Sequence, residues 1–275
     1  MQRGKLIFLN GVTSTGKSTI AELIREMSCE ILYTSSNDIF HDMVSVSRFD
    51  GNFWCLAAHS VIAQYHAVRG MINGGFHVVI DGMFLEREEY PHLFGKSHHT
   101  LFGEIFAGIQ PVIVNLVCPP DELRRRNRVR GNRRENQSDY QLQFMAQNIC
   151  PDLTLDVMTV MPDECAELIL RCAGIPYALP DKARRERHRV HILEKLLFSF
   201  DAEITPTENP SLSEDASVID TTVHTVRPDQ SREIAVFLLL RGYSVYPKEY
   251  PGTILLERRT NDRLTEICRI CCDCV

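Results

Sequence analysis

The stretch "LIFLNGVTSTGKST", residues 6–19, decides the fold of this 275-residue chain. An apolar run ends at Asn10, and residues 11–18 then fit the pattern G-x-x-x-x-G-K-[ST]. The apolar residues after Ser18 recur at a helical spacing. The order strand, glycine-containing loop, helix is the context that a phosphate-binding loop requires. The alternative is an ordinary glycine turn with an incidental lysine.

The residue types of this loop suit a chain of phosphates. Glycines allow the backbone N–H groups to turn inward, and the first turn of the next helix adds unpaired N–H groups and a positive dipole end. We expect Lys17 to neutralise the β- and γ-phosphates and Ser18 to offer its hydroxyl to Mg²⁺. The candidate nucleotide-binding residues are Gly11, Val12, Thr13, Ser14, Thr15, Gly16, Lys17, Ser18 and Thr19.

The composition is that of an ordinary globular protein, with 44% hydrophobic and 24% charged residues. No apolar run reaches the ~18 residues of a membrane-spanning helix, and the apolar run at the N-terminus is too short for a signal peptide. We therefore expect a cytoplasmic protein without a transmembrane segment. The net charge of −6 argues against a general nucleic-acid binder.

The ten cysteines form two groups. Six are scattered and are expected to be reduced thiols at apolar positions. The other four are Cys268, Cys271, Cys272 and Cys274. Their single C-x-x-C makes a zinc site possible but strained, and "CDCV" is a poor prenylation box. Palmitoylation, which would attach the chain to a membrane, and a thiol tail without a specific role are the open alternatives.

Strands and helices alternate over residues 5–174. We expect strands near residues 5–10, 31–34, 76–84, 111–120 and 152–159, and a loop at "SHHT", residues 97–100. This alternation predicts an α/β fold, a doubly wound parallel sheet with helices on both faces. Ligands bind outside the carboxyl ends of such strands. The phosphate loop, Asp38 and Asp81 all fall at those ends.

A second region follows. We expect residues 1–176 to form one domain and residues 177–275 to form an extension of unknown role. Its pattern is a basic helix at 181–200, a linker at 201–217, a strand and helix at 218–243 and two short strands at 243–259. The strand–proline–helix–glycine order of 218–243 repeats that of 153–174. Whether it joins the first sheet or forms a small α/β appendage is open.

Four segments resemble the chloramphenicol phosphotransferase-like group of P-loop kinases: "FLNGVTSTGKST", "SSNDIFHDM", "VVIDGMFL" and "RNRVRGNR". The resemblance covers residues 5–174. It implies an ATP- and Mg²⁺-dependent phosphotransferase that moves the γ-phosphate to a hydroxyl of a small molecule. In the fourth segment Asn132 stands where the group's lid often has Asp.

The resemblance also implies that the third strand lies beside the phosphate-loop strand. Asp81 would then sit next to Ser18 and hold Mg²⁺ or its water; alternatively it caps the strand end. Asp38 is the candidate base, since a carboxylate within hydrogen-bond reach accepts the proton of the attacking hydroxyl or orients it. The alternative for Asp38 is a helix N-cap.

Seven arginines crowd residues 124–134, which we call the arginine segment. A lid would place Arg126, Arg130 and Arg133 over the phosphates, where charge develops during transfer. Arg124, Arg125 and Arg134 are expected on a solvated helix face. A nucleic-acid patch is the third interpretation, but the segment lacks interleaved aromatic residues.

Three questions stay open at this stage. His41, Trp54, His59 and His66 could line an acceptor pocket, or simply pack on a helix. Instead of an active enzyme, the chain could be a nucleotide-binding switch or degenerate kinase that acts through a protein partner. The acceptor could also be a nucleoside, a nucleotide sugar or a macromolecular hydroxyl. The sequence does not define the oligomeric state.

Overall fold

The computed structural model describes residues 3–49, 52–86, 95–131, 134–146, 149–197, 199–200, 202–207, 218–247, 253–260 and 263–272. The chain divides into two compact units, Met1–Ala178 and Leu179–Val275. Each unit is described by itself.

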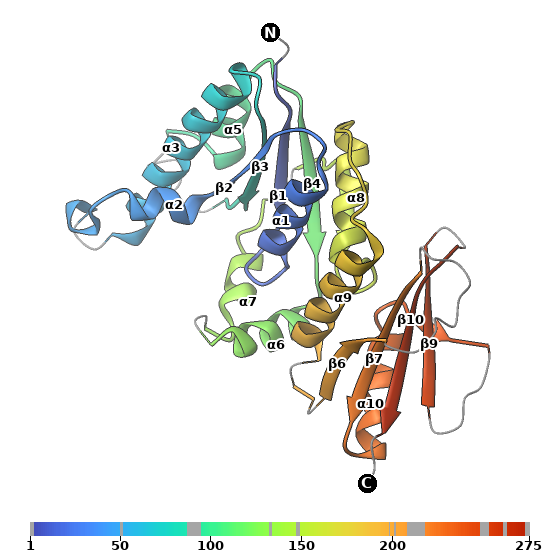
Figure 1. Cartoon of the computed structure of the whole chain (residues 1–275). Helices are drawn as coiled ribbons and strands as arrows, with labels where there is room; N and C mark the ends of the chain where they lie inside the picture. The colour runs from blue at the N-terminus through green and yellow to red at the C-terminus, as the bar shows by residue number, and fades with distance from the viewer. Residues whose placement is uncertain are drawn as a thin grey trace. The chain divides into compact units, whose positions relative to one another are not determined.

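The first unit is built on a parallel sheet of five strands in the order β2-β3-β1-β4-β5 (Figure 1). The strands are β1 (Leu6–Asn10), β2 (Leu32–Ser36), β3 (His77–Gly82), β4 (Pro111–Val117) and β5 (Leu153–Asp156). The predicted doubly wound α/β fold is confirmed. The third strand pairs with the phosphate-loop strand, as the resemblance implied.

Helices cover both faces of this sheet (Figure 1). They are α1 (Lys17–Met27), α2 (Asn37–Asp42), α3 (Phe53–Asn73), α5 (His98–Ile105), α6 (Pro120–Arg130), α7 (Gln137–Leu142) and α8 (Pro162–Ala173), with a 3₁₀ turn at Val46–Phe49. The loop expected at residues 97–100 is wrong. Ser97 caps α5 by accepting a hydrogen bond from the Thr100 N–H, so the two histidines begin a helix.

The central strand explains why the sheet needs two helical layers. Every residue of β1 is buried. Ile7 and Leu9 pack into the core that α1 and α8 cover, whereas Leu6 and Phe8 pack into the core that α3 and α5 cover. Successive side chains of a strand point to opposite faces, so a continuous apolar run requires an apolar layer on each side.

The second unit has its own five-stranded sheet, in the order β6-β7-β10-β9-β8 (Figure 1). Its elements are α9 (Lys182–Leu196), β6 (Ala202–Pro206), β7 (Ile219–Thr225), α10 (Pro228–Leu239), β8 (Ser244–Val245), β9 (Thr253–Thr260) and β10 (Arg263–Cys272). The strand and helix of 218–243 thus belong to this second sheet. The expectation of a linker over 201–217 is wrong for its first part, because β6 pairs with β7 there.

The cysteine-rich end is a strand rather than a free tail. β10 lies between β7, to which it is parallel, and β9, to which it is antiparallel. Cys268 is fully buried, and Cys271 and Cys272 are half-buried; Cys274 lies outside the described residues. Among the residues that the structure describes, no cluster of three or more His, Cys, Asp or Glu could hold a metal ion, so the zinc alternative is not supported there.

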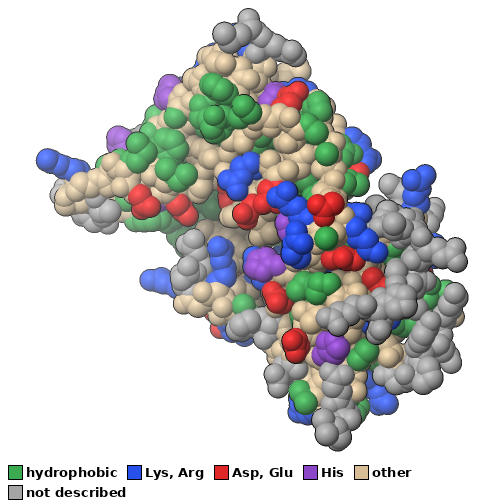
Figure 2. Space-filling view, in the orientation of Figure 1, with side chains coloured by type: hydrophobic (Ala, Val, Ile, Leu, Met, Phe, Trp, Pro, Cys, Tyr) green, Lys and Arg blue, Asp and Glu red, His purple; other side chains and the backbone are tan. Residues whose placement is uncertain are grey.

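The surface carries both signs of charge. On the face that Figure 2 shows, Lys and Arg side chains lie interspersed with Asp and Glu side chains rather than in one extended patch of a single sign. Within the described ranges, no helix is both long enough and apolar enough to cross a membrane.

Candidate active site

The predicted site residues meet at the carboxyl edge of the first sheet. Asp81, near the end of β3, is level with Leu9 of β1 on one side and with Ser36 of β2 on the other. The phosphate loop leaves β1 directly after this level, and Asp38 follows β2. Three separate segments therefore converge on one edge, because parallel strands end at the same side of the sheet.

The conformation of the loop requires its two glycines. Gly16 has a φ of 96°, in the left-handed region that glycine adopts without penalty. A Cβ atom on Gly11 would lie 2.9 Å from the Thr15 Oγ1 and 3.1 Å from the Leu116 carbonyl oxygen, so only glycine fits there. Gly16 is also the N-cap of α1, and no described side chain caps this helix start. The first N–H groups of α1 are thus available to an anion.

Lys17 bends back over the loop. Its Nζ donates a hydrogen bond to the Val12 carbonyl at 2.9 Å and lies 3.7 Å from Asp81 Oδ1. Burial lowers the pKa of Lys17, the Asp81 carboxylate opposes this effect, and Arg130 adds to it. A mostly buried ammonium group has lost much of its stabilising water, so it is stabilised strongly by the negative charge of a bound phosphate.

Ser18 and Asp81 form the best-defined contact of the site. The Ser18 hydroxyl donates to Asp81 Oδ2 at 2.6 Å. A hydroxyl oxygen and a carboxylate oxygen are the hard donors that Mg²⁺ takes from proteins, together with waters and phosphate oxygens. The pair therefore fits a Mg²⁺ ion held beside the phosphates. The alternative, in which Asp81 only caps loop amides, has no described contact that favours it.

Asp38 lies in the first turn of α2 but is not its cap. Ser36 is the N-cap, and its hydroxyl accepts the Asp38 N–H at 3.2 Å. The N-cap alternative for Asp38 is therefore wrong. The Asp38 side chain is exposed, and its charge acts on Lys17. Since another residue does the capping, this carboxylate is available for an acceptor at the same edge.

Part of the arginine segment faces the loop. Arg126 donates to the Ser14 carbonyl at 3.4 Å and to Glu122 at 2.8 Å, and Arg130 is close enough for its charge to act on Lys17. Both lie in α6, so this part of the predicted lid is helical. Arg133, the third candidate, and Asn132 lie outside the described residues.

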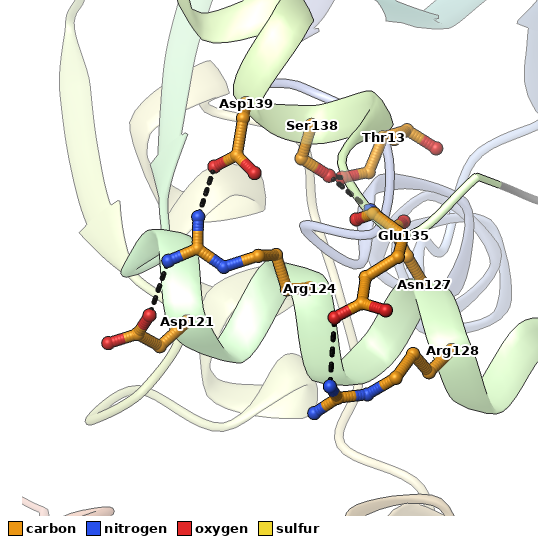
Figure 3. A network of polar contacts seen from close by, with 8 residues as sticks. All are labelled: Thr13, Asp121, Arg124, Asn127, Arg128, Glu135, Ser138 and Asp139. Carbon is orange, nitrogen blue, oxygen red and sulfur yellow. Dashed lines mark hydrogen bonds and ion pairs between the residues drawn. The ribbon is translucent and has the colours of Figure 1, made fainter.

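Of the arginines expected on a solvated helix face, Arg134 is exposed, whereas Arg124 and Arg125 are half-buried in ion pairs. Arg124 pairs with Asp121 at 2.5 Å and with Asp139 of α7 at 2.8 Å (Figure 3). Arg125 pairs with the buried Glu122 at 2.8 Å. Burial raises the pKa of Glu122, but the hydrogen bonds and charges of Arg125 and Arg126 outweigh burial and lower it to about 2. The i,i+3 and i,i+4 spacing of Glu122 to these arginines indicates such ion pairs from the sequence alone.

The pattern of the sequence did not predict a polar network that holds the phosphate loop from the side. It consists of Asn127 in α6 and of Ser138 and Gln141 in α7, which contact Thr13 and Ser14 of the loop. No local sequence motif identifies these residues, because their polar contacts with the loop join segments more than 100 positions apart.

The four candidate acceptor-pocket residues lie on the neighbouring helices. The His41 ring lies edge-on to Phe53, with centroids 5.9 Å apart, and His59 contacts Phe49 at 5.3 Å. Trp54 is half-buried next to Phe53, whereas His66 is exposed. His41 is three positions from Asp38 on α2; the other three lie on α3.

A loop of this sequence and conformation between a central parallel strand and a helix defines the nucleotide-binding P-loop class. Residues 4–173, more than half of the chain, match the family described as chloramphenicol phosphotransferase-like protein. The chain belongs to this family. It is accordingly a phosphotransferase, and the predicted enzyme class is confirmed.

Several solved structures align with 62–65% of this chain and with almost the whole of their own chains. The APS kinase CysC of Mycobacterium tuberculosis, in complex with AMPPNP and APS, is 19% identical, with a TM-score of 0.49, over 63% of this chain and 99% of that one. The tunicamycin resistance protein of Deinococcus radiodurans is 15% identical, with a TM-score of 0.47, over 65% and 100%. The shikimate kinase of Bacteroides thetaiotaomicron is 15% identical, with a TM-score of 0.42, over 62% and 99%. No curated protein matches the chain.

Proposed function

We propose that the chain transfers the γ-phosphate of ATP, with Mg²⁺, to a hydroxyl of a small molecule. One observation carries the proposal. Lys17, Ser18 and Asp81 lie in contact at the edge where the phosphate loop opens, and Asp38 stands at the same edge with its carboxylate not used as a cap. A donor site and a base on one edge are what an in-line transfer requires.

On this proposal the donor is held by the loop. The N–H groups of Gly16 and of the start of α1 bind the phosphate oxygens, and Lys17 neutralises their charge. Ser18 and Asp81 would hold Mg²⁺, which supplies further neutralisation of the β- and γ-phosphate oxygens. Val12 loses its hydrogen bond from Lys17 when this side chain turns to the phosphates.

The acceptor side depends on Asp38. As the bond between the acceptor oxygen and the γ-phosphorus forms and the bond to the β-phosphate oxygen breaks, the acceptor hydroxyl passes its proton to the Asp38 carboxylate. Since the transition state is loose, holding the hydroxyl in line contributes as much as basicity. The products are ADP and a phosphate monoester.

The arginines act on the charge that develops during transfer. Arg126 and Arg130, with Arg133 of the same segment, would donate to the equatorial oxygens of the γ-phosphoryl group, where fixed donors lower the barrier. The charge of Arg130 already reaches Lys17, which supports its place at the phosphates.

The experiment is transfer of labelled phosphate from ATP by the purified full chain, with a panel of amino alcohols, sugars, nucleosides and a nucleotide sugar. We expect a labelled monoester of at least one class, and none without Mg²⁺. Lys17→Ala should lose both ATP affinity and transfer, whereas the exposed Lys195→Ala should retain both. If the wild-type chain binds no ATP and labels no acceptor, the proposal is wrong.

A further inference from the structure

The middle of the phosphate loop is held by α6 and α7. Both backbone groups of Thr13 are engaged by α7. The Thr13 N–H donates to Gln141 Oε1 at 2.7 Å, and the Thr13 carbonyl accepts the Ser138 hydroxyl at 3.1 Å. The next residue, Ser14, has a φ of 65°, a left-handed conformation that is unfavourable for a residue with a Cβ atom. Contacts around Ser14 must therefore maintain this conformation.

Asn127 makes the central contact. Its side chain is 0% exposed, and Figure 3 shows it between the loop and α7. The Ser14 hydroxyl donates to Asn127 Oδ1 at 2.7 Å. Asn127 Nδ2 donates to the Glu135 carbonyl at 2.9 Å and to the Ser138 hydroxyl at 2.8 Å.

The direction of these bonds is determined. A carbonyl oxygen only accepts, so the amide nitrogen of Asn127 must face Glu135, and the amide oxygen must face Ser14. A buried amide with both donors and its acceptor satisfied is a rigid connection, and removing it would leave several buried polar groups unpaired.

We propose that Asn127 is a positioning residue that connects the phosphate loop to the arginine segment. This inference rests on the proposed function. Asn127 lies between Arg126 and Arg130 on α6, and through Ser14 and Ser138 it sets where both arginines stand relative to the loop. The arginines and the loop amides thus reach the phosphates as one assembly, and the shape of residues 13 and 14 is prepared before nucleotide arrives.

The test compares Asn127→Ala, Ser14→Ala and the double variant with Asn136→Ala. Asn136 is an exposed asparagine of the same region whose side chain does not cap α7. Calorimetry with ATP and Mg²⁺ is performed at a temperature at which all variants are folded. Each single change of the pair should raise the Kd about 10-fold, the equivalent of ~1.4 kcal/mol. The double variant should be no weaker than Asn127→Ala by more than about 2-fold, since both changes break the same connection.

A second measurement needs no nucleotide. Hydrogen exchange of the amides of residues 12–16 should be faster in Asn127→Ala than in the wild type, with exchange in α1 unchanged. Ser14→Ala, which removes one hydroxyl, serves if Asn127→Ala does not fold. Exchange and Kd equal to those of Asn136→Ala would overturn the inference, as would a double variant whose losses simply add. If the wild-type chain binds no ATP, the proposed function fails instead, and exchange alone reports on the connection.

Discussion

The Ser18 hydroxyl donates a hydrogen bond to the Asp81 carboxylate at 2.6 Å, across 63 positions of sequence. One residue belongs to the start of α1 and the other to the end of β3. The contact exists because β3 pairs directly with β1, level by level, so that the end of β3 lies beside the loop that leaves β1. It is the relationship on which the Mg²⁺ assignment depends.

Asp81→Asn is expected to raise the Mg²⁺ concentration needed for half-maximal transfer by about 10-fold or more, the scale of disturbing a residue that orients a metal ligand. The amide keeps an oxygen that accepts from Ser18, but the negative charge is lost. A Mg²⁺ titration at constant ATP measures the change. Equal titrations for wild type and variant would leave Asp81 without a role at the metal.

Asp38→Asn is expected to lower the transfer rate by ~10²- to 10⁴-fold, the range for loss of a general base. ATP affinity and folding should stay near those of the wild type, because Lys17 and Ser18 hold the donor. Asp42→Asn, an exposed aspartate on the same helix, is the matched control. Equal rates for both variants would remove Asp38 from catalysis.

Arg130→Ala is expected to lower turnover by ~10- to 1,000-fold, the scale for removing one transition-state donor. Its melting temperature should change little, since the end of α6 contributes few core contacts. Arg134→Ala, an exposed neighbour in the arginine segment, should retain activity. An Arg130→Ala protein that melts early yet turns over normally would show a structural arginine.

Because His98 is buried, we expect the free energy of unfolding to fall in mild acid. Burial lowers its pKa to about 4 from the usual 6.5. Between these values the unfolded chain binds a proton and the folded chain does not, so stability is present above pH 6.5 and is lost as pH falls toward 4. From pH 7.5 to 5 the loss from this one group is about 2 kcal/mol. Urea unfolding should show a shallower pH dependence for His98→Gln; identical slopes would contradict this account.

Cys268 is expected to resist alkylation until the second unit unfolds. Burial, with the nearby Glu266 charge, raises the pKa of this thiol well above its usual value, and only a thiolate reacts. Iodoacetamide under native conditions should label the exposed Cys29 and Cys150, with Cys268 labelled only in denaturant, as peptide mass spectrometry can show. Native labelling of Cys268 would mean that β10 is not buried in the sheet.

Local patterns were sufficient for the first unit. The apolar run of β1, the spacing of Gly11, Gly16, Lys17 and Ser18, and the polar residues at strand ends predicted the parallel sheet and the edge on which the site lies. The loop can be predicted from sequence because phosphate binding depends on the backbone conformation of consecutive residues. The central strand can be predicted because burial on both faces requires a continuous apolar run.

Sequence patterns did not predict the structural role of residues whose contacts come from strands far away in the sequence. The cysteines of β10 looked like a free tail because their spacing suggested thiol chemistry, whereas pairing with β7 and β9 makes Cys268 a core residue.

The sequence by itself determined the class of fold, the phosphate loop and the place of Asp38 and Asp81 at strand ends. Only the tertiary structure decided that Ser36 rather than Asp38 caps α2, and that Asn127 joins the loop to the arginine segment. The physical reason is the distance in sequence over which each interaction acts. Helix and strand propensity and loop conformation depend on neighbours in sequence, whereas a buried amide finds its three partners only when distant segments have packed.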